Sequence, residues 1–248
     1  MNGLIKEDRC MMQTLPTQLT LGISLKDEAT FDNFYEGRNG EVISALKKMA
    51  RGPEEKFIYL CGAQGQGSSH LLKAACHEAD QHKRRSFYLP LAYSCSLSPE
   101  ILQGLEAFSL ICLDDFHVLS AHPEWEEAIF HLYNRVEETR GSLLIAARDL
   151  PKSIALTLPD LISRLSFGIT YQIHPLRDEE KCTVLMMRAN RRGMSLSEEV
   201  GKYIMTHCPR HMGALFSVLD LLDKVSLAAQ RRLTIPFVKE VLQIEDLK

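Results

Sequence analysis

Three features that define large classes of proteins are missing from this sequence: long apolar runs, paired cysteines and an excess of one charge. No stretch approaches the roughly 20 uninterrupted apolar residues of a membrane helix, and charged residues interrupt the N-terminus before a signal-peptide pattern forms. The seven cysteines form no Cys-x-x-Cys pair and the nine histidines no His-Glu-x-x-His pattern, so we expect neither a disulfide framework nor a structural metal. Lys and Arg total 29 against 32 Asp and Glu, which argues against a protein that mainly coats nucleic-acid phosphates. We expect a cytoplasmic protein without membrane contacts.

What is present is the pattern of an α/β protein of 248 residues, long enough for one large domain or two small ones. Short apolar runs alternate with amphipathic stretches, which predicts a parallel sheet with helices on both faces. The predicted strands are 57–61, 86–90, 110–113, 142–147 and 169–173, and the predicted helices between them are 41–50, 69–81, 99–107 and 125–139. Only helical patterns follow, at 177–192, 197–207, 211–228 and 235–243. We therefore predict a tail (1–29), an α/β base domain (30–174) and a small all-α lid domain (175–248).

A glycine-rich turn joins the predicted strand 57–61 to the next helix. Residues 62–69 read Gly-Ala-Gln-Gly-Gln-Gly-Ser-Ser, the spacing of a Walker A loop G-x-x-x-x-G-K-[ST], with Ser68 in the position of the lysine. Such a loop directs backbone N–H groups and a helix N-terminus at a phosphate. Ser68 is neutral and too short to reach the β and γ phosphates, so we expect weak ATP binding and barely detectable hydrolysis. A strand–helix turn without a ligand is the alternative.

Two carboxylates, Asp114 and Asp115, end the apolar run 110–113, as in a Walker B strand. Ligands bind at the carboxyl ends of strands in open α/β sheets. Asp114, with the hydroxyl of Ser69, would help to hold Mg²⁺, and Asp115 would lie where a water is activated. A solvated turn is the alternative interpretation.

Together these motifs resemble the AAA+ superfamily and, within it, the DnaA group. Residues 31–39 (Phe-Asp-Asn-Phe-Tyr-Glu-Gly-Arg-Asn) resemble the segment beside the adenine pocket, and residues 68–74 resemble the start of the phosphate-loop helix. Residues 158–165 (Leu-Pro-Asp-Leu-Ile-Ser-Arg-Leu) resemble the segment that carries an arginine finger, here Arg164. The resemblance implies an AAA+ P-loop base domain, a helical lid and an adenine-nucleotide site. The residues implied to contact the nucleotide are Phe34, Gly62, Gly65, Gly67, Ser68, Ser69 and His70.

The end of the chain and residues 132–135 (Leu-Tyr-Asn-Arg) are similar to regulatory homologues within that group. This similarity implies a negative regulator of chromosomal replication initiation: an adaptor that binds the sliding clamp, the β subunit of DNA polymerase III, and promotes hydrolysis of ATP held by DnaA. Arg164 would act in trans on that ATP, and DNA would be reached mainly through the clamp. The sequence leaves open whether the protein forms a homo-oligomer.

The tail contains a segment with the form of a clamp-binding peptide. Gln18 offers an amide for hydrogen bonding, while Leu19, Leu21 and Ile23 are spaced to fill an apolar pocket. An extended segment of this kind suits peptide-in-groove recognition. The alternative is that the leucines pack back on the domain.

Two departures from the family pattern affect the nucleotide. Gly213 stands where the family usually has an arginine that contacts the nucleotide, and Arg210, nearly one helical turn earlier, is a candidate substitute. Arg148 and Asp149 appear in the reverse of the usual order. With Ser68, these changes suit ADP or a monophosphate better than ATP, and they leave open whether a nucleotide binds.

Two other functions are compatible with the same motifs. One is a self-sufficient ATPase of the initiator or helicase-loader kind, and the other is a DnaA-related DNA-tethering protein that does not bind the clamp. Basic clusters at 83–85, 191–192 and 231–232 could touch DNA. Because each lies at a predicted helix end, solvated helix termini are the simpler interpretation.

Overall fold

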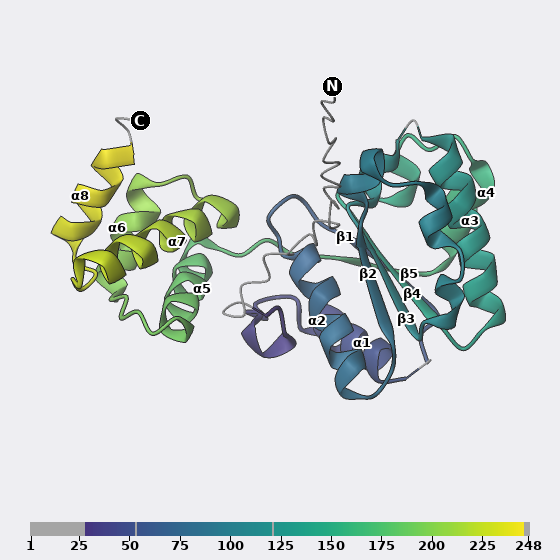
Figure 1. Ribbon diagram of the computed structural model, residues 1–248, viewed down its shortest axis with the longest axis horizontal. Helices are drawn as coiled ribbons and strands as arrows, with labels where there is room; N and C mark the ends of the chain where they lie inside the picture. The colour runs from purple at the N-terminus through teal and green to yellow at the C-terminus, as the bar shows by residue number, and fades with distance from the viewer. Residues whose placement is uncertain (1–27, 53, 121, 246–248) are drawn as a thin grey trace, which may run out of the picture.

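The computed structural model describes residues 28–52, 54–120 and 122–245, which form an α/β domain and a C-terminal helical domain (Figure 1). The segment proposed to bind the clamp, with Gln18, Leu19, Leu21 and Ile23, lies outside the described residues. In the described ranges, none of the helices has the length and apolar character needed to cross a membrane.

Five parallel strands form the sheet of the α/β domain, in the order β2-β3-β4-β1-β5. They are β1 (Phe57–Cys61), β2 (Ser86–Pro90), β3 (Leu110–Asp114), β4 (Ser142–Ala147) and β5 (Ile169–Gln172). β1, β3 and β4 are buried along their whole length, as their continuous apolar sequences predict. Because β4 lies between β1 and β3, the carboxyl ends of these three strands meet at one edge of the sheet.

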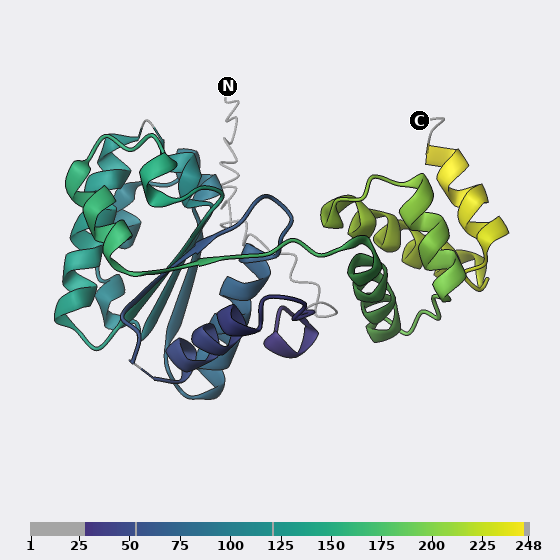
Figure 2. The same ribbon diagram turned by 180° about the vertical axis from the view of Figure 1, so that it is seen from behind.

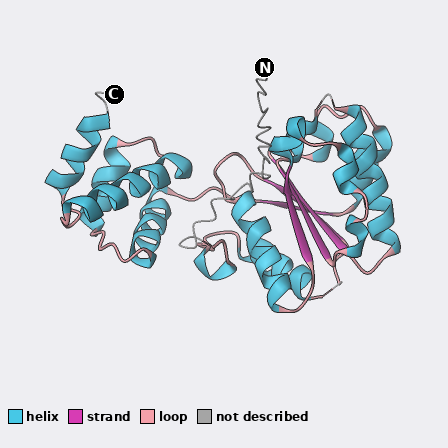
Figure 3. Cartoon of the chain, viewed as in Figure 1, coloured by secondary structure: helices cyan, strands magenta, loops and turns pink. Residues whose placement is uncertain are grey.

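Helices cover both faces of this sheet (Figure 3). The apolar side chains of α1 (Gly40–Arg51) and α2 (Ser68–Gln81) pack with Ile58 and Leu60 of β1. The intervening β1 residues Phe57, Tyr59 and Cys61 face the opposite cluster, built on α3 (Pro123–Glu138) and α4 (Pro159–Phe167). The period of two along a strand therefore divides the core into two layers, and the predicted α/β class is confirmed.

One predicted helix, at 99–107, is wrong. The segment forms two short 3-10 helices, η4 (Pro99–Leu102) and η5 (Leu105–Ala107). Gly104 between them has φ = 77°, a left-handed conformation that an α-helix does not contain. The apolar residues Leu102 and Leu105 are still buried in the α3 layer, which explains their helix-like spacing.

Within the described residues, the C-terminal domain contains four helices: α5 (Asp178–Arg191), α6 (Glu198–His207), α7 (Met212–Ala229) and α8 (Ile235–Glu245). Their apolar faces make a separate core. A single extended segment connects β5 to α5, and Figure 2 shows it crossing between the two domains. The buried side chain of Asn39 holds this segment, since its Oδ1 accepts from the His174 N–H (2.7 Å) and its Nδ2 donates to the His174 carbonyl (3.2 Å).

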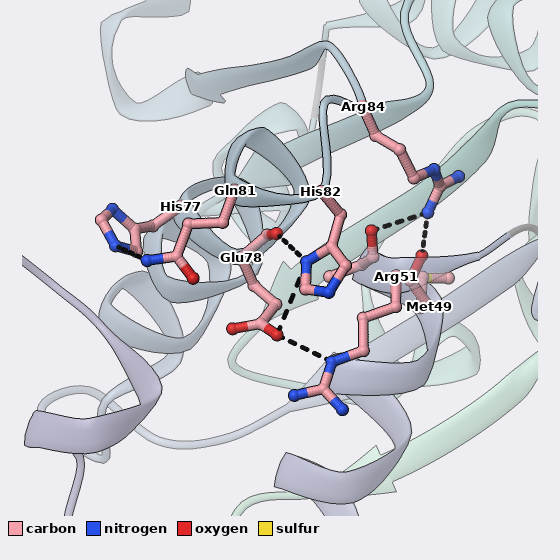
Figure 4. Close-up of polar contacts among 8 residues, drawn as sticks. Met49, Arg51, His77, Glu78, Gln81, His82 and Arg84 are labelled. Atoms are coloured by element: carbon pink, nitrogen blue, oxygen red, sulfur yellow. Dashed lines mark hydrogen bonds and ion pairs between the residues drawn. The ribbon is translucent and has the colours of Figure 1, made fainter.

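At least one arginine of each basic cluster bonds within the protein, although Lys83, Arg85, Arg191, Arg231 and Arg232 are exposed. Arg84 donates to the carbonyls of Met49, Ala50 (2.8 Å) and Gly52 (3.0 Å), so it caps the C-terminal end of α1 (Figure 4). Its cation neutralises the negative end of another helix, not of its own. In the C-terminal domain Arg191 donates to the Asp32 carbonyl (2.7 Å), Arg192 pairs with Asp220 and Arg231 pairs with Glu240 (2.9 Å).

Candidate functional site

The glycine-rich loop lies at the carboxyl end of β1 and leads directly into α2. Gly65 and Gly67 have φ angles of 80° and 100°, which favour glycine, and Gly67 caps α2 without any side-chain cap bond. The first N–H groups of α2 are thus left for a ligand, and the helix dipole favours an anion there. Gln66 closes the loop, since its Oε1 accepts from the Ala63 N–H (3.0 Å). The arrangement fits a phosphate group.

A cavity of about 470 Å³ opens between this loop and the C-terminal domain. Phe34 and His70 form part of its wall, with ring centroids 5.4 Å apart. His70 bonds through Nε2 to the Thr30 carbonyl (2.9 Å), and its burial lowers its pKa, which favours a neutral ring. Apolar and aromatic walls beside a phosphate-binding loop suit a nucleobase.

A second cavity, of about 290 Å³, lies below the loop at the carboxyl edge of the sheet. Ser68, Ser69, Asp114, Asp115 and Arg148 all line it, so the structure brings the predicted Walker A and Walker B residues together. The buried Asp114 accepts from the Tyr88 hydroxyl (2.8 Å) and from the Asp115 N–H (2.9 Å), which fixes its carboxylate. Burial, and then the negative charge of Asp114, raise the pKa of Asp115.

The C-terminal domain brings cations to the larger cavity. Lys181, Arg188, Arg191 and Arg210 line it, together with residues of the loop. Arg210 and Lys181 both pair with Asp178, at 2.7 and 2.9 Å. Gly213 is exposed at the start of α7, and a Cβ there would meet only His211, at 3.5 Å. Position 213 therefore has room for a longer side chain, but the sequence has glycine there.

Comparison with known proteins finds a family model for the C-terminal domain and solved structures of the same fold. Residues 178–242 match the family model of the Hda lid domain. The chain is also similar to DnaA domain III of Thermotoga maritima, with a TM-score of 0.76, 17% identity, and coverage of 87% of this chain and 96% of that one. The chain has an AAA+ fold with an Hda-type lid.

Two longer initiator structures are also similar. A DNA replication initiation factor gives a TM-score of 0.67 at 20% identity. The match covers 79% of this chain and 64% of that one. The replication initiator DnaA bound to AMPPCP and single-stranded DNA gives 0.65 at 20% identity, with coverage of 78% of this chain and 64% of that one. The chain thus spans a little under two thirds of these initiators.

Arg164 lies on α4 of the AAA+ domain, in the helical layer formed with α3. Leu161 and Leu165 of α4 are fully buried, so Arg164 is on the exposed side, with 44% of its side chain accessible. Its guanidinium is 3.3 Å from Glu137 Oε2 and 5.6 Å from the centre of the Tyr133 ring. Phe167, one turn later on the same side, is 91% exposed. Among the described residues that line the two cavities, none comes from α4.

The structure also identifies a residue that the sequence analysis missed. Glu126 of α3 is fully buried, and its Oε2 accepts from the backbone N–H groups of Thr157 and Leu158, both at 2.8 Å. The Thr157 hydroxyl donates to the same oxygen (3.1 Å). α4 begins at the next residue, so Glu126 fixes the start of the helix that carries Arg164.

Gly67→Ala should destabilise the AAA+ domain by about 1–3 kcal/mol and displace Phe34. An added Cβ would lie 2.7 Å from Phe34 Cε2, and φ is 100°. Gly104→Ala is the matched control, because Gly104 also has a positive φ but nothing within 4 Å of a Cβ. Thermal unfolding should show the larger loss for Gly67→Ala, and equal losses would contradict the close contact with Phe34.

Proposed function

We propose that this AAA+ chain is a regulatory adaptor of DnaA, a negative regulator of replication initiation. Docked on the sliding clamp through residues 18–23, it promotes hydrolysis of the ATP that DnaA holds. Its own site binds nucleotide weakly and hydrolyses ATP inefficiently. The Hda-type lid supports this role, and the initiator neighbours support a task in DNA replication.

The observation that carries the proposal is the position of Arg164 relative to the chain's own loop. The arginine is exposed on α4, outside both cavities beside the loop, and the loop has Ser68 where a lysine would hold the β and γ phosphates. A fixed planar cation stabilises the charge that develops on a transferred phosphoryl group, and it can be supplied in trans. The chain would lend this arginine to an ATP bound by DnaA.

The nucleotide site fits a diphosphate better than ATP. The loop amides and the start of α2 would hold its phosphates, Phe34 and His70 would contact the base, and Ser69 and Asp114 would hold Mg²⁺. When bound, the metal would neutralise phosphate charge. No cation from the loop itself reaches a γ phosphate, since residues 62–69 contain neither lysine nor arginine.

Ser68→Lys should therefore tighten ATP binding by roughly tenfold to a hundredfold, because it restores one charge-assisted contact. Ser68→Ala serves as the control, since it changes the side chain without adding charge. Calorimetric titration of both variants with ATP and Mg²⁺ checks this. Equal ATP affinities for Ser68→Lys and the unaltered protein would contradict it.

The clamp contact is tested in the tail. Gln18→Ala combined with Leu19→Ala should abolish co-elution with the sliding clamp and leave the melting temperature unchanged, because the peptide docks on the clamp and not on the domain. Substituting Gln13 and Thr14 by alanine provides a control in the same tail. A clear fall in melting temperature would show that the leucines pack on the AAA+ domain instead.

A further inference from the structure

We propose that Phe167, at the C-terminal end of α4, is the apolar anchor of the surface that docks on DnaA, a role that rests on the proposed function. Arg164 would act on the rate of ATP hydrolysis, while Phe167 would determine how tightly the chain holds its partner. The surface of DnaA that receives Phe167 is an apolar patch beside its ATP site.

Phe167 is the most exposed large apolar side chain in the part of the chain that the structure describes, at 91%. Burial of an aromatic side chain removes roughly 150–250 Å² from contact with water, and this gain is still available at Phe167. Aromatic residues and arginine are enriched at the centres of protein interfaces. Phe167 and Arg164 are therefore the kind of residues that anchor a contact between proteins.

The backbone presents Phe167 from a fixed position. Leu165 holds the other side of α4 in the core, and Glu126 accepts hydrogen bonds at the start of the helix. At the other end, Gly168 lies so close to β1 that an added Cβ would collide with the Phe57 ring. The exposed side of α4 is thus ordered before a partner arrives, which reduces the entropy lost on docking.

Arg164 and Phe167 are three residues apart on α4, so their side chains lie on the same side of the helix. This helix and α3 cover the side of the AAA+ domain that faces away from the C-terminal domain (Figure 1). A guanidinium in water attracts a phosphate only weakly, because the dielectric constant of water is high. Arg164 becomes effective when a partner covers it, and a partner that covers Arg164 must also contact Phe167.

Charge favours DnaA over a second copy of this chain as the partner. The ATP held by DnaA presents negative phosphates to Arg164, whereas a second copy would present a loop with Ser68 in the lysine position. A twofold contact centred on Phe167 would bring two Arg164 guanidinium groups within one helical turn of the axis, where they repel each other. The exposed ion pair with Glu137 would offset only part of this repulsion.

The test separates affinity from rate. The chain and its variants, on clamp-loaded DNA, are titrated against a fixed amount of DnaA loaded with ATP, and single-turnover hydrolysis is measured. Phe167→Ala should raise the concentration for half-maximal stimulation by roughly tenfold to a hundredfold and leave the maximal rate unchanged. Phe167→Trp should keep tight docking. Neither the melting temperature nor co-elution with the clamp should change, because the side chain is exposed.

Two further variants serve as controls. Tyr93→Ala removes another exposed aromatic side chain (65%) in η3 (Leu91–Ser96), which follows β2 at the edge of the sheet opposite β5, and it should change neither quantity. Arg164→Ala should lower the maximal rate, so an unaffected Phe167→Ala beside a defective Arg164→Ala would overturn the docking role alone. Full stimulation by Arg164→Ala would instead contradict the proposed function.

Two other results would overturn the docking role of Phe167. A lower maximal rate in Phe167→Ala, with an unchanged half-maximal concentration, would mean that the side chain positions Arg164 and does not dock. If sedimentation velocity shows that the unaltered chain self-associates and that Phe167→Ala abolishes this, the occupant is a second copy of the chain.

Discussion

Arg164→Ala should remove the stimulation of DnaA-bound ATP hydrolysis while leaving the fold and clamp binding intact. An arginine supplied in trans is worth about 10³–10⁵ in the rate of phosphoryl transfer, so its loss should return hydrolysis to the rate of DnaA by itself. The fold should tolerate the change, because the Arg164 side chain is 44% exposed and its ion pair with Glu137 is also exposed. Single-turnover hydrolysis with clamp-loaded DNA measures the effect.

Two variants make this result specific. Arg164→Lys should rescue little, because an ammonium group lacks the forked geometry of a guanidinium. Glu137→Ala frees the arginine from its ion pair and should leave stimulation largely intact. Full stimulation by Arg164→Ala would show that the arginine is only a surface charge.

Glu126→Ala should destabilise the AAA+ domain by about 2–5 kcal/mol, since the N–H groups of Thr157 and Leu158 and the Thr157 hydroxyl lose their hydrogen bonds to a buried carboxyl group. The corresponding fall in melting temperature is on the order of 10 °C. Stimulation should also fall at temperatures where the variant is folded, because the start of α4, and with it Arg164, is no longer fixed.

Glu126→Gln is the matched control, since it keeps the volume of the side chain and one acceptor oxygen. It should retain more of the stability and more of the stimulation than Glu126→Ala. Glu127→Ala, next along α3 at an exposed position, should change neither. If Glu126→Ala has the same melting temperature as the unaltered protein, the proposed role of this carboxyl group is contradicted.

The sheet and the phosphate loop could be predicted because their causes are local. The apolar run 57–61 has no polar residue to face solvent, so it had to be a strand buried on both faces, and the glycines at 65 and 67 marked the turn after it. The helix predicted at 99–107 failed for a local reason as well. The apolar residues of 99–107 have the spacing of a helix, and this pattern led to the prediction although Gly104 lies among them.

Contacts between distant segments could not be predicted in this way. Arg148 lines the phosphate cavity because β4 lies between β1 and β3, and strand order is not visible in the spacing of residues. The sequence does indicate that Glu126 is buried. It precedes Ile129 by three residues and Tyr133 by seven, which places it on the buried side of α3. Its partners, Thr157 and Leu158, are about 30 residues away in sequence and only the fold brings them together.

The most direct test of the adaptor account distinguishes two pools of ATP in one reaction. DnaA is loaded with ATP that carries one isotope, free ATP carries another, and this chain is added with clamp-loaded DNA. The account predicts that the ATP held by DnaA is hydrolysed rapidly while the free pool stays intact, and that omission of the clamp prevents the reaction. Rapid conversion of the free pool, with the ATP on DnaA unaffected, would contradict the account and identify the chain as a self-sufficient ATPase.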